Sequence, residues 1–64
     1  MKTLVYKIHK NELDGNSELI TKGNESEVRI KWNELEAEKG FDYDLSVGWE
    51  LNGKSLGTTL LESK

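Results

Sequence analysis

Two carboxylates, Asp42 and Asp44, are the residues of this sequence whose spacing best fits a chemical role. On a β-strand they point the same way, with Cα atoms roughly 6.5 to 7 Å apart. Calcium takes about six to eight oxygen ligands, more than this pair supplies. Further oxygens could come from the preceding segment, which holds Asn33, Glu34, Glu36 and Glu38. Asp42 and Asp44 are therefore candidate calcium ligands.

The acidic pair also has a simpler interpretation. Arg29 and Lys31 could face Asp42 and Asp44 from a neighbouring strand and balance their charge, or the acidic face could only be solvated. Both alternatives remain open from the sequence.

Groups suited to catalysis are scarce. His9 is the only histidine, cysteine is absent, and no serine has a partner suggested by its neighbours. Acid–base catalysis needs a cleft that shifts carboxyl pKa values, and a domain of this length seldom encloses one. The glycines form no phosphate-binding loop. We therefore expect no enzymatic activity and no cofactor, except calcium if the acidic pair binds it.

The charge of the chain limits its partners. A net charge of −3 disfavours duplex nucleic acid, which needs clustered basic residues. Single-stranded bases could stack on Tyr6, Trp32, Tyr43 and Trp49, but by alternation all four rings belong to the inward face. No segment has the apolar run of a signal sequence or a membrane span, so we expect a soluble, cytoplasmic protein.

Apolar and polar residues alternate along most of the chain, which predicts one small globular domain over residues 1–64. The favoured fold class is all-β: a small antiparallel five-stranded sheet, meander or barrel-like, with one short helical turn near 33–39. Its strands are expected at 3–9, 17–22, 27–32, 41–51 and 54–62.

Residues 25–39 also fit a single helix. The helix would carry Val28, Trp32 and Leu35 on one stripe and leave Ile30 on the far side, whereas a strand over 27–32 misplaces no apolar residue. The alternative fold is therefore α+β, a ββαββ grasp-like arrangement with this helix on a four-stranded sheet.

Asn52-Gly53 predicts a tight hairpin, because both central residues of a type I′ turn take positive φ. An uninterrupted register pairs Leu51 with Lys54 and places Gly48 opposite Gly57 on the outer face. The inward residues of this register and of both folds are Trp32, Leu45, Val47, Trp49, Leu56 and Leu60. The glycine pair could leave a bare backbone patch for another chain, with Val5 and Leu61 adding apolar area, or could only mark a bulge.

The segments "VRIKWN", "GFDYDLS" and "LNGK" together resemble the tellurium-resistance TerD family of bacterial stress proteins over residues 28–54. The residues that match in kind and order are Trp32, Phe41, Asp42, Asp44, Ser46, Gly53 and Lys54. The resemblance implies a β-sandwich, a cytoplasmic location and calcium binding through Asp42 and Asp44. Asn33 stands where the family has an acid after the tryptophan, so the resemblance adds Asn33 to the candidate calcium ligands. The family's domain is longer than this chain.

Three functions follow from the sequence. The leading one is a non-catalytic protein-interaction module that presents a sheet face or edge to a protein partner. The second is a calcium-binding, TerD-like stress-response module, and the third is binding of single-stranded nucleic acid. A homo-oligomer fits the short chain, because a domain of this size buries only about 60% of its unfolded surface.

Overall fold

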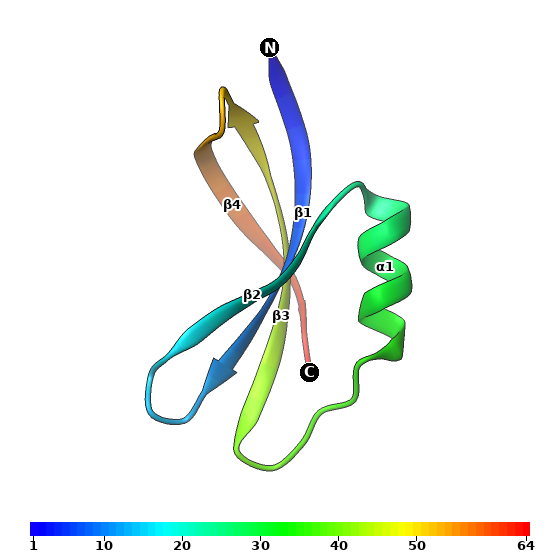
Figure 1. The fold of residues 1–64 in the computed structure, drawn as a ribbon, viewed down its shortest axis with the longest axis vertical. Coiled ribbons are helices and arrows are strands. Elements are labelled where there is room, and N and C mark those ends of the chain that lie inside the picture. Colours follow the sequence, from blue (N-terminus) through cyan, green and yellow to red (C-terminus); the bar gives the residue numbers. More distant parts are fainter.

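One helix and four strands make up the computed structural model, which describes residues 1–64 (Figure 1). The elements are β1 (Lys2–Glu12), β2 (Ser17–Gly23), α1 (Glu25–Glu34), β3 (Phe41–Leu51) and β4 (Lys54–Ser63). The strands form one sheet in the order β2-β1-β3-β4, and every neighbouring pair is antiparallel. Helix α1 packs on one face of the sheet, and no element covers the other face. The single helix is too short and too polar to cross a membrane.

The predominance of antiparallel strands agrees with the favoured fold class, but five strands and a barrel do not form. The predicted strand 27–32 and the turn near 33–39 are replaced by α1, so the element order is that of the ββαββ alternative. The Asn24 side chain caps the helix by accepting a hydrogen bond from the Glu27 N–H at 2.9 Å. Val28 and Trp32 are buried on one stripe, which outweighs the exposure of Ile30.

The side chain of Lys64 binds the last turn of α1. The Lys64 ammonium donates to the backbone carbonyls of Trp32, at 2.6 Å, and Leu35, at 2.8 Å. It also lies 4.8 Å from the centroid of the Trp32 ring. The Trp32 carbonyl also accepts the Leu35 N–H, so the ammonium adds a second donor there, and it complements the negative end of the helix dipole.

The core lies between α1 and the middle of the sheet. Its buried residues are Ile8, Val28, Trp32, Tyr43 and Leu45, and Tyr6, Ile20, Leu35 and Phe41 pack against them. The core prediction is correct for Trp32 and Leu45, and Val47 is half-buried. It is wrong for Trp49, Leu56 and Leu60, which are all exposed.

The hairpin begins as predicted and then changes register. Asn52 and Gly53 have φ of 52° and 81°, and Leu51 pairs with Lys54. A bulge follows between Gly48 and Glu50, so that Gly48 pairs with Thr58 and not with Gly57. Because one extra residue turns the side chains that follow it to the other face, Leu60 pairs with Ser46 and leaves the face that α1 covers; a second shift follows between Leu60 and Glu62.

Candidate protein-interaction surface

The acidic pair lies on the face of the sheet opposite α1. Asn11 is the β1 partner of Asp42, and its side-chain amide donates to Asp42 Oδ1 at 3.1 Å and to Asp44 Oδ2 at 2.6 Å. The Ser63 hydroxyl donates to Asp44 Oδ1 at 2.8 Å, and the Ser17 hydroxyl donates to Asn11 Oδ1 at 2.7 Å. Donors from neighbouring strands therefore hold the two carboxylates together.

The expected companions of the acidic pair lie elsewhere. Asn33 is an exposed residue of α1, on the other side of the sheet, so the structure does not bring it to Asp42 and Asp44. Arg29 is bonded to Glu62, an interaction that raises the pKa of its guanidinium. No three His, Cys, Asp or Glu side chains are grouped so as to hold a metal ion. Calcium binding stays a prediction.

Sequence reasoning missed Asn11, because its role depends on the pairing of β1 with β3. The two strands are separated by about half the chain, and local alternation does not fix such a register. The available signal was the pair of polar positions, Asn11 and Lys7, that alternate with the inward residues of β1.

A hollow of about 370 Å³ lies on the same open face. Its lining residues are Lys7, His9, Asn11, Asp44, Ser46, Thr58 and Leu60. The ammonium of Lys7 is 2.9 Å from the carboxylate of Glu50, and this hydrogen bond lowers the Glu50 pKa. Lys7 is thus ion-paired with Glu50, and Asp44 accepts hydrogen bonds from Asn11 and Ser63, so both groups already have partners within the chain.

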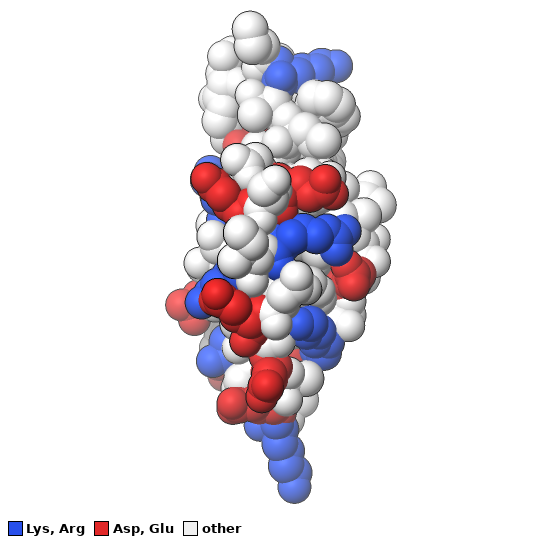
Figure 2. Space-filling model, turned by 90° about the vertical axis from the view of Figure 1, so that its right-hand side faces the viewer, with Lys and Arg blue, Asp and Glu red and all other residues white.

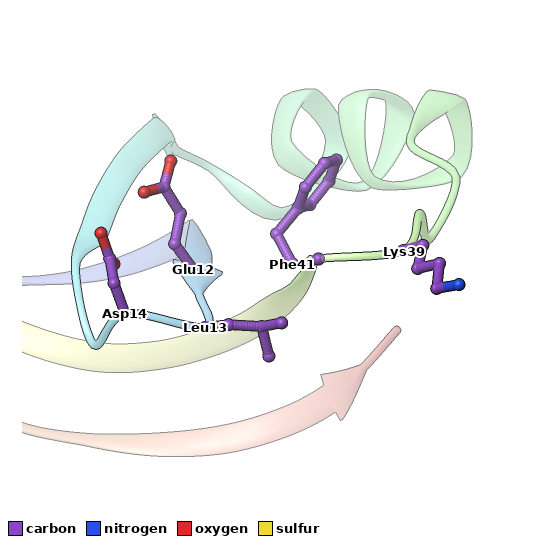
Figure 3. Close-up of a pocket in the computed structure, with 6 residues that line it drawn as sticks. Glu12, Leu13, Asp14, Lys39 and Phe41 are labelled. Atoms are coloured by element: carbon purple, nitrogen blue, oxygen red, sulfur yellow. The ribbon is translucent and has the colours of Figure 1, made fainter.

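A second hollow, of about 400 Å³, lies where the β1–β2 turn meets the start of β3 (Figure 3). Phe41 and the 88% exposed Leu13 supply its apolar side. In Figure 3 the carboxylates of Glu12 and Asp14 point away from the ammonium of Lys39, so these three groups do not converge on one point.

Apart from the acidic pair and the two hollows, one part of the sheet is not covered by α1. The start of β1 and the β3–β4 hairpin extend past the helix at the top of Figure 1, and β2 ends opposite Tyr6. We call residues 2–5, 47–51 and 54–58 the bare end of the sheet. It is a single layer of three strands, whereas stable domains normally bury a sheet face against a second layer.

Apolar side chains gather on one face of the bare end, the face that also carries α1. Leu4 and Trp49 are direct partners across β1 and β3, and Leu56 lies opposite Trp49 by alternation from the Glu50–Ser55 pair. Their exposed fractions are 42%, 50% and 53%. Val47 and Leu51 are half-buried on the same face. These five residues form one continuous apolar surface.

The charges near this apolar surface are basic. Lys2 and Lys54 both pair with Leu51, at the tip of the sheet. The one acid of the bare end, Glu50, points to the opposite face and is bonded to Lys7. Figure 2 shows the upper part of the molecule largely free of charge below its basic tip, with acidic and basic side chains interspersed lower down.

The predicted partner surface of Val5, Gly48, Gly57 and Leu61 is only partly assembled. Val5 and Gly48 are direct partners on the open face, but Leu61 lies farther along β4, at the second shift in strand pairing between Leu60 and Glu62. A Cβ at Gly48 would collide with the carbonyl oxygen of Gly57. The glycine at position 48 therefore makes room for the chain's own bulge.

Comparisons with protein-family models, with curated proteins and with solved structures found no match for this chain.

Proposed function

We propose that the protein is a non-catalytic protein-interaction module and that its docking surface is the apolar face of the bare end. The observation that carries the proposal is the half-exposure of Leu4, Trp49 and Leu56 on adjacent positions of a single-layer sheet. Isolated exposed apolar residues are ordinary on a protein surface, but a contiguous group of them marks an interaction site.

The total surface of the chain supports a missing partner. A folded monomer of 7.3 kDa is expected to expose about 4,200 Å². This chain exposes 4592 Å², an excess of about 400 Å² by the same scaling. A standard interface buries about 800 Å² on each partner, so the excess is a substantial part of one docking surface.

The chemistry of the face defines the partner that it suits. Trp49 supplies a large ring of the kind that is enriched at the energetic centre of interfaces. Lys2 and Lys54 border the apolar face at the tip of the sheet, on either side of Leu51, and no acid shares this face of the bare end. The complementary surface is therefore an apolar patch bordered by carboxylates, because opposite charges at the rim guide association and fix orientation.

Site-specific crosslinking tests the docking surface. A photo-crosslinking amino acid replaces Leu56, on the bare end, or Leu13, which is exposed at the opposite end of the molecule and serves as the control. We expect discrete protein adducts from position 56, lost on Trp49→Lys, and none from position 13. Equal labelling from both positions would contradict the proposal.

A nucleic-acid ligand gives a different result on the same surface. Trp49 is half-exposed, contrary to the prediction that all four rings face the core, so an oligonucleotide that stacks on it would quench its emission at low salt. Such quenching without protein adducts would assign the face to single-stranded nucleic acid.

A further inference from the structure

We infer, resting on the proposed function, that the partner is a second copy of this chain and that α1 of each copy lies on the bare end of the other. The arrangement is a closed two-fold dimer: two sheets face each other, and both helices fill the layer between them. Each contact occurs twice, as symmetry requires of such an interface.

The dimensions of the elements fit this arrangement. The bare end continues for four residues of β1, from Lys2 to Val5, which is about 13 Å of strand. Helix α1 has ten residues and is about 15 Å long. One helix therefore has the length needed to cover the bare end of its partner.

The outward side of α1 carries an exposed apolar residue and carboxylates, which complement the apolar and basic residues of the bare end. Ile30 points away from the chain's own sheet and is 63% exposed, whereas Val28 and Trp32 on the inward stripe are buried. The helix neighbours of Ile30, three and four positions away, are Ser26, Glu27, Asn33 and Glu34. Ile30 is thus an apolar knob bordered by two carboxylates and two small polar side chains, and it suits the surface around Trp49.

Charge complements this shape. Lys2 and Lys54 on the bare end have no ion-pair partner within the chain, and neither do Glu27 and Glu34 on α1. In the dimer the two lysines of one copy face the two glutamates of the other, and the symmetry repeats the set. Such pairs set the orientation of an interface more than its strength.

Dimerisation would add buried apolar surface to a chain whose own core is small. Only five of the 64 residues are buried in the single chain. The dimer would cover Leu4, Trp49, Leu56 and Ile30 on both copies, and removing large apolar side chains from water favours association. Association that occurs only in the folded state makes the melting temperature rise with protein concentration.

Sedimentation equilibrium and thermal melting of the full chain test the inference. We expect a particle of twice the 7.3 kDa chain mass and a melting temperature that rises across about a hundredfold range of concentration. Ile30→Lys and Trp49→Lys should each weaken the dimer at least about tenfold, since a buried lysine would lack a partner. Leu13→Lys, an exposed change at the other end, should leave it unaltered, and circular dichroism checks that each variant folds.

Charge reversal separates this arrangement from other dimers. Lys2→Glu with Lys54→Glu makes both contact surfaces acidic, and Glu27→Lys with Glu34→Lys makes both basic, so each double variant alone should dimerise at least about tenfold more weakly. Mixed together, the two should form a heterodimer of near wild-type affinity. A dimer that joins two bare ends would contain no helix contact, and the Glu27 and Glu34 changes would not weaken it.

The outcomes are distinguishable. A monomer at every concentration would overturn the inference, while adducts between position 56 and a different protein would leave the proposed function standing. A dimer that Ile30→Lys does not weaken would overturn the helix-on-sheet arrangement. A monomer whose Trp49 emission is quenched by an oligonucleotide would overturn both the inference and the proposed function.

Discussion

Replacing Gly48 with alanine should destabilise the β3–β4 hairpin through a collision with the chain's own backbone. The added Cβ would meet the carbonyl oxygen of Gly57, and the Thr58 methyl carbon Cγ2 lies 3.0 Å from its position. Gly57 has φ of 127°, which the bulge in β4 requires. A carbonyl inside a paired strand cannot rotate aside like a side chain, so the bulge itself must shift.

Two opposing effects determine the magnitude. Alanine in place of glycine within a strand gains about 0.5–1 kcal/mol, because it loses less conformational entropy on folding. Overpacking a closely packed site costs about 1–3 kcal/mol, and a backbone obstacle lies at the upper end of that range. The net loss is therefore about 2 kcal/mol, which corresponds to a fall of roughly 10 °C in the melting temperature of a domain this small.

Deleting Gly57 provides the matched background for urea denaturation followed by circular dichroism at one protein concentration. The deletion removes the bulge residue and lets Leu56 and Thr58 follow each other opposite Trp49 and Gly48, so later pairs keep their partners. In this background Gly48→Ala should cost less than about 0.5 kcal/mol or stabilise the protein. An equal loss in both backgrounds would show that the Gly57 carbonyl is not the obstacle.

Three further predictions concern the helix cap, the ion pair and the acidic pair. Asn24→Ala removes the acceptor of the Glu27 N–H and should lower the free energy of unfolding by about 1 kcal/mol in urea titrations, whereas Asn24→Asp should retain most of it. The Lys7 hydrogen bond lowers the pKa of Glu50 from its ordinary value of 4.5, so the ionised carboxylate stabilises the fold above that value and ceases to do so as the pH falls through the lowered pKa. Glu50→Gln should therefore reduce the melting temperature near pH 7 but not in acid below that pKa, and an equal reduction at both would contradict the ion-pair argument. Asn11→Asp adds a carboxylate beside Asp42 and Asp44, so millimolar calcium should shift the amide NMR signals of residues 41–45 more in this variant than in the wild type. No shift in either protein would end the calcium hypothesis.

The sequence predicts the local features of the fold well. Asn52 and Gly53 form the expected turn because its positive φ values are a property of those two residues. The bulge that follows was only an alternative, because it depends on how the two glycines approach each other. A register predicted from alternation alone is therefore correct up to the Glu50–Ser55 pair and wrong for the part of β4 that follows the bulge.

The choice between strand and helix at residues 25–34 shows the limit of propensity. Val28, Ile30 and Trp32 are strand-forming residue types, and their alternation favours a strand. The Asn24 cap and the burial of Val28 and Trp32 on Ile8 and Leu45 outweigh that preference. The contact of Lys64 with the last turn of α1 joins residues 29 and 32 positions apart in the chain, and no local sequence pattern contains it.

For the acidic pair, the sequence predicts the face on which the two carboxylates lie but not their hydrogen-bond partners. Alternation correctly placed Asp42 and Asp44 together on a face away from the apolar residues. Their hydrogen-bond partners, Asn11 and Ser63, come from two other strands, so their identity depends on pairings between distant segments. A single sequence fixes which face a side chain occupies more readily than what it meets there.

Two of the three errors in the predicted core, Trp49 and Leu56, have one physical origin, whereas Leu60 is exposed because of the bulge. Alternation marks a residue for burial but does not state whether the covering atoms belong to the same chain. Trp49 and Leu56 follow the inward pattern of their strands, yet α1 is too short to reach them. Ile30 breaks the inward pattern of α1 and is left on its outer side. The single chain leaves all three exposed. In the two-fold dimer that we propose, Ile30 of one copy would cover Trp49 and Leu56 of the other, so one arrangement would account for the exposure of all three residues.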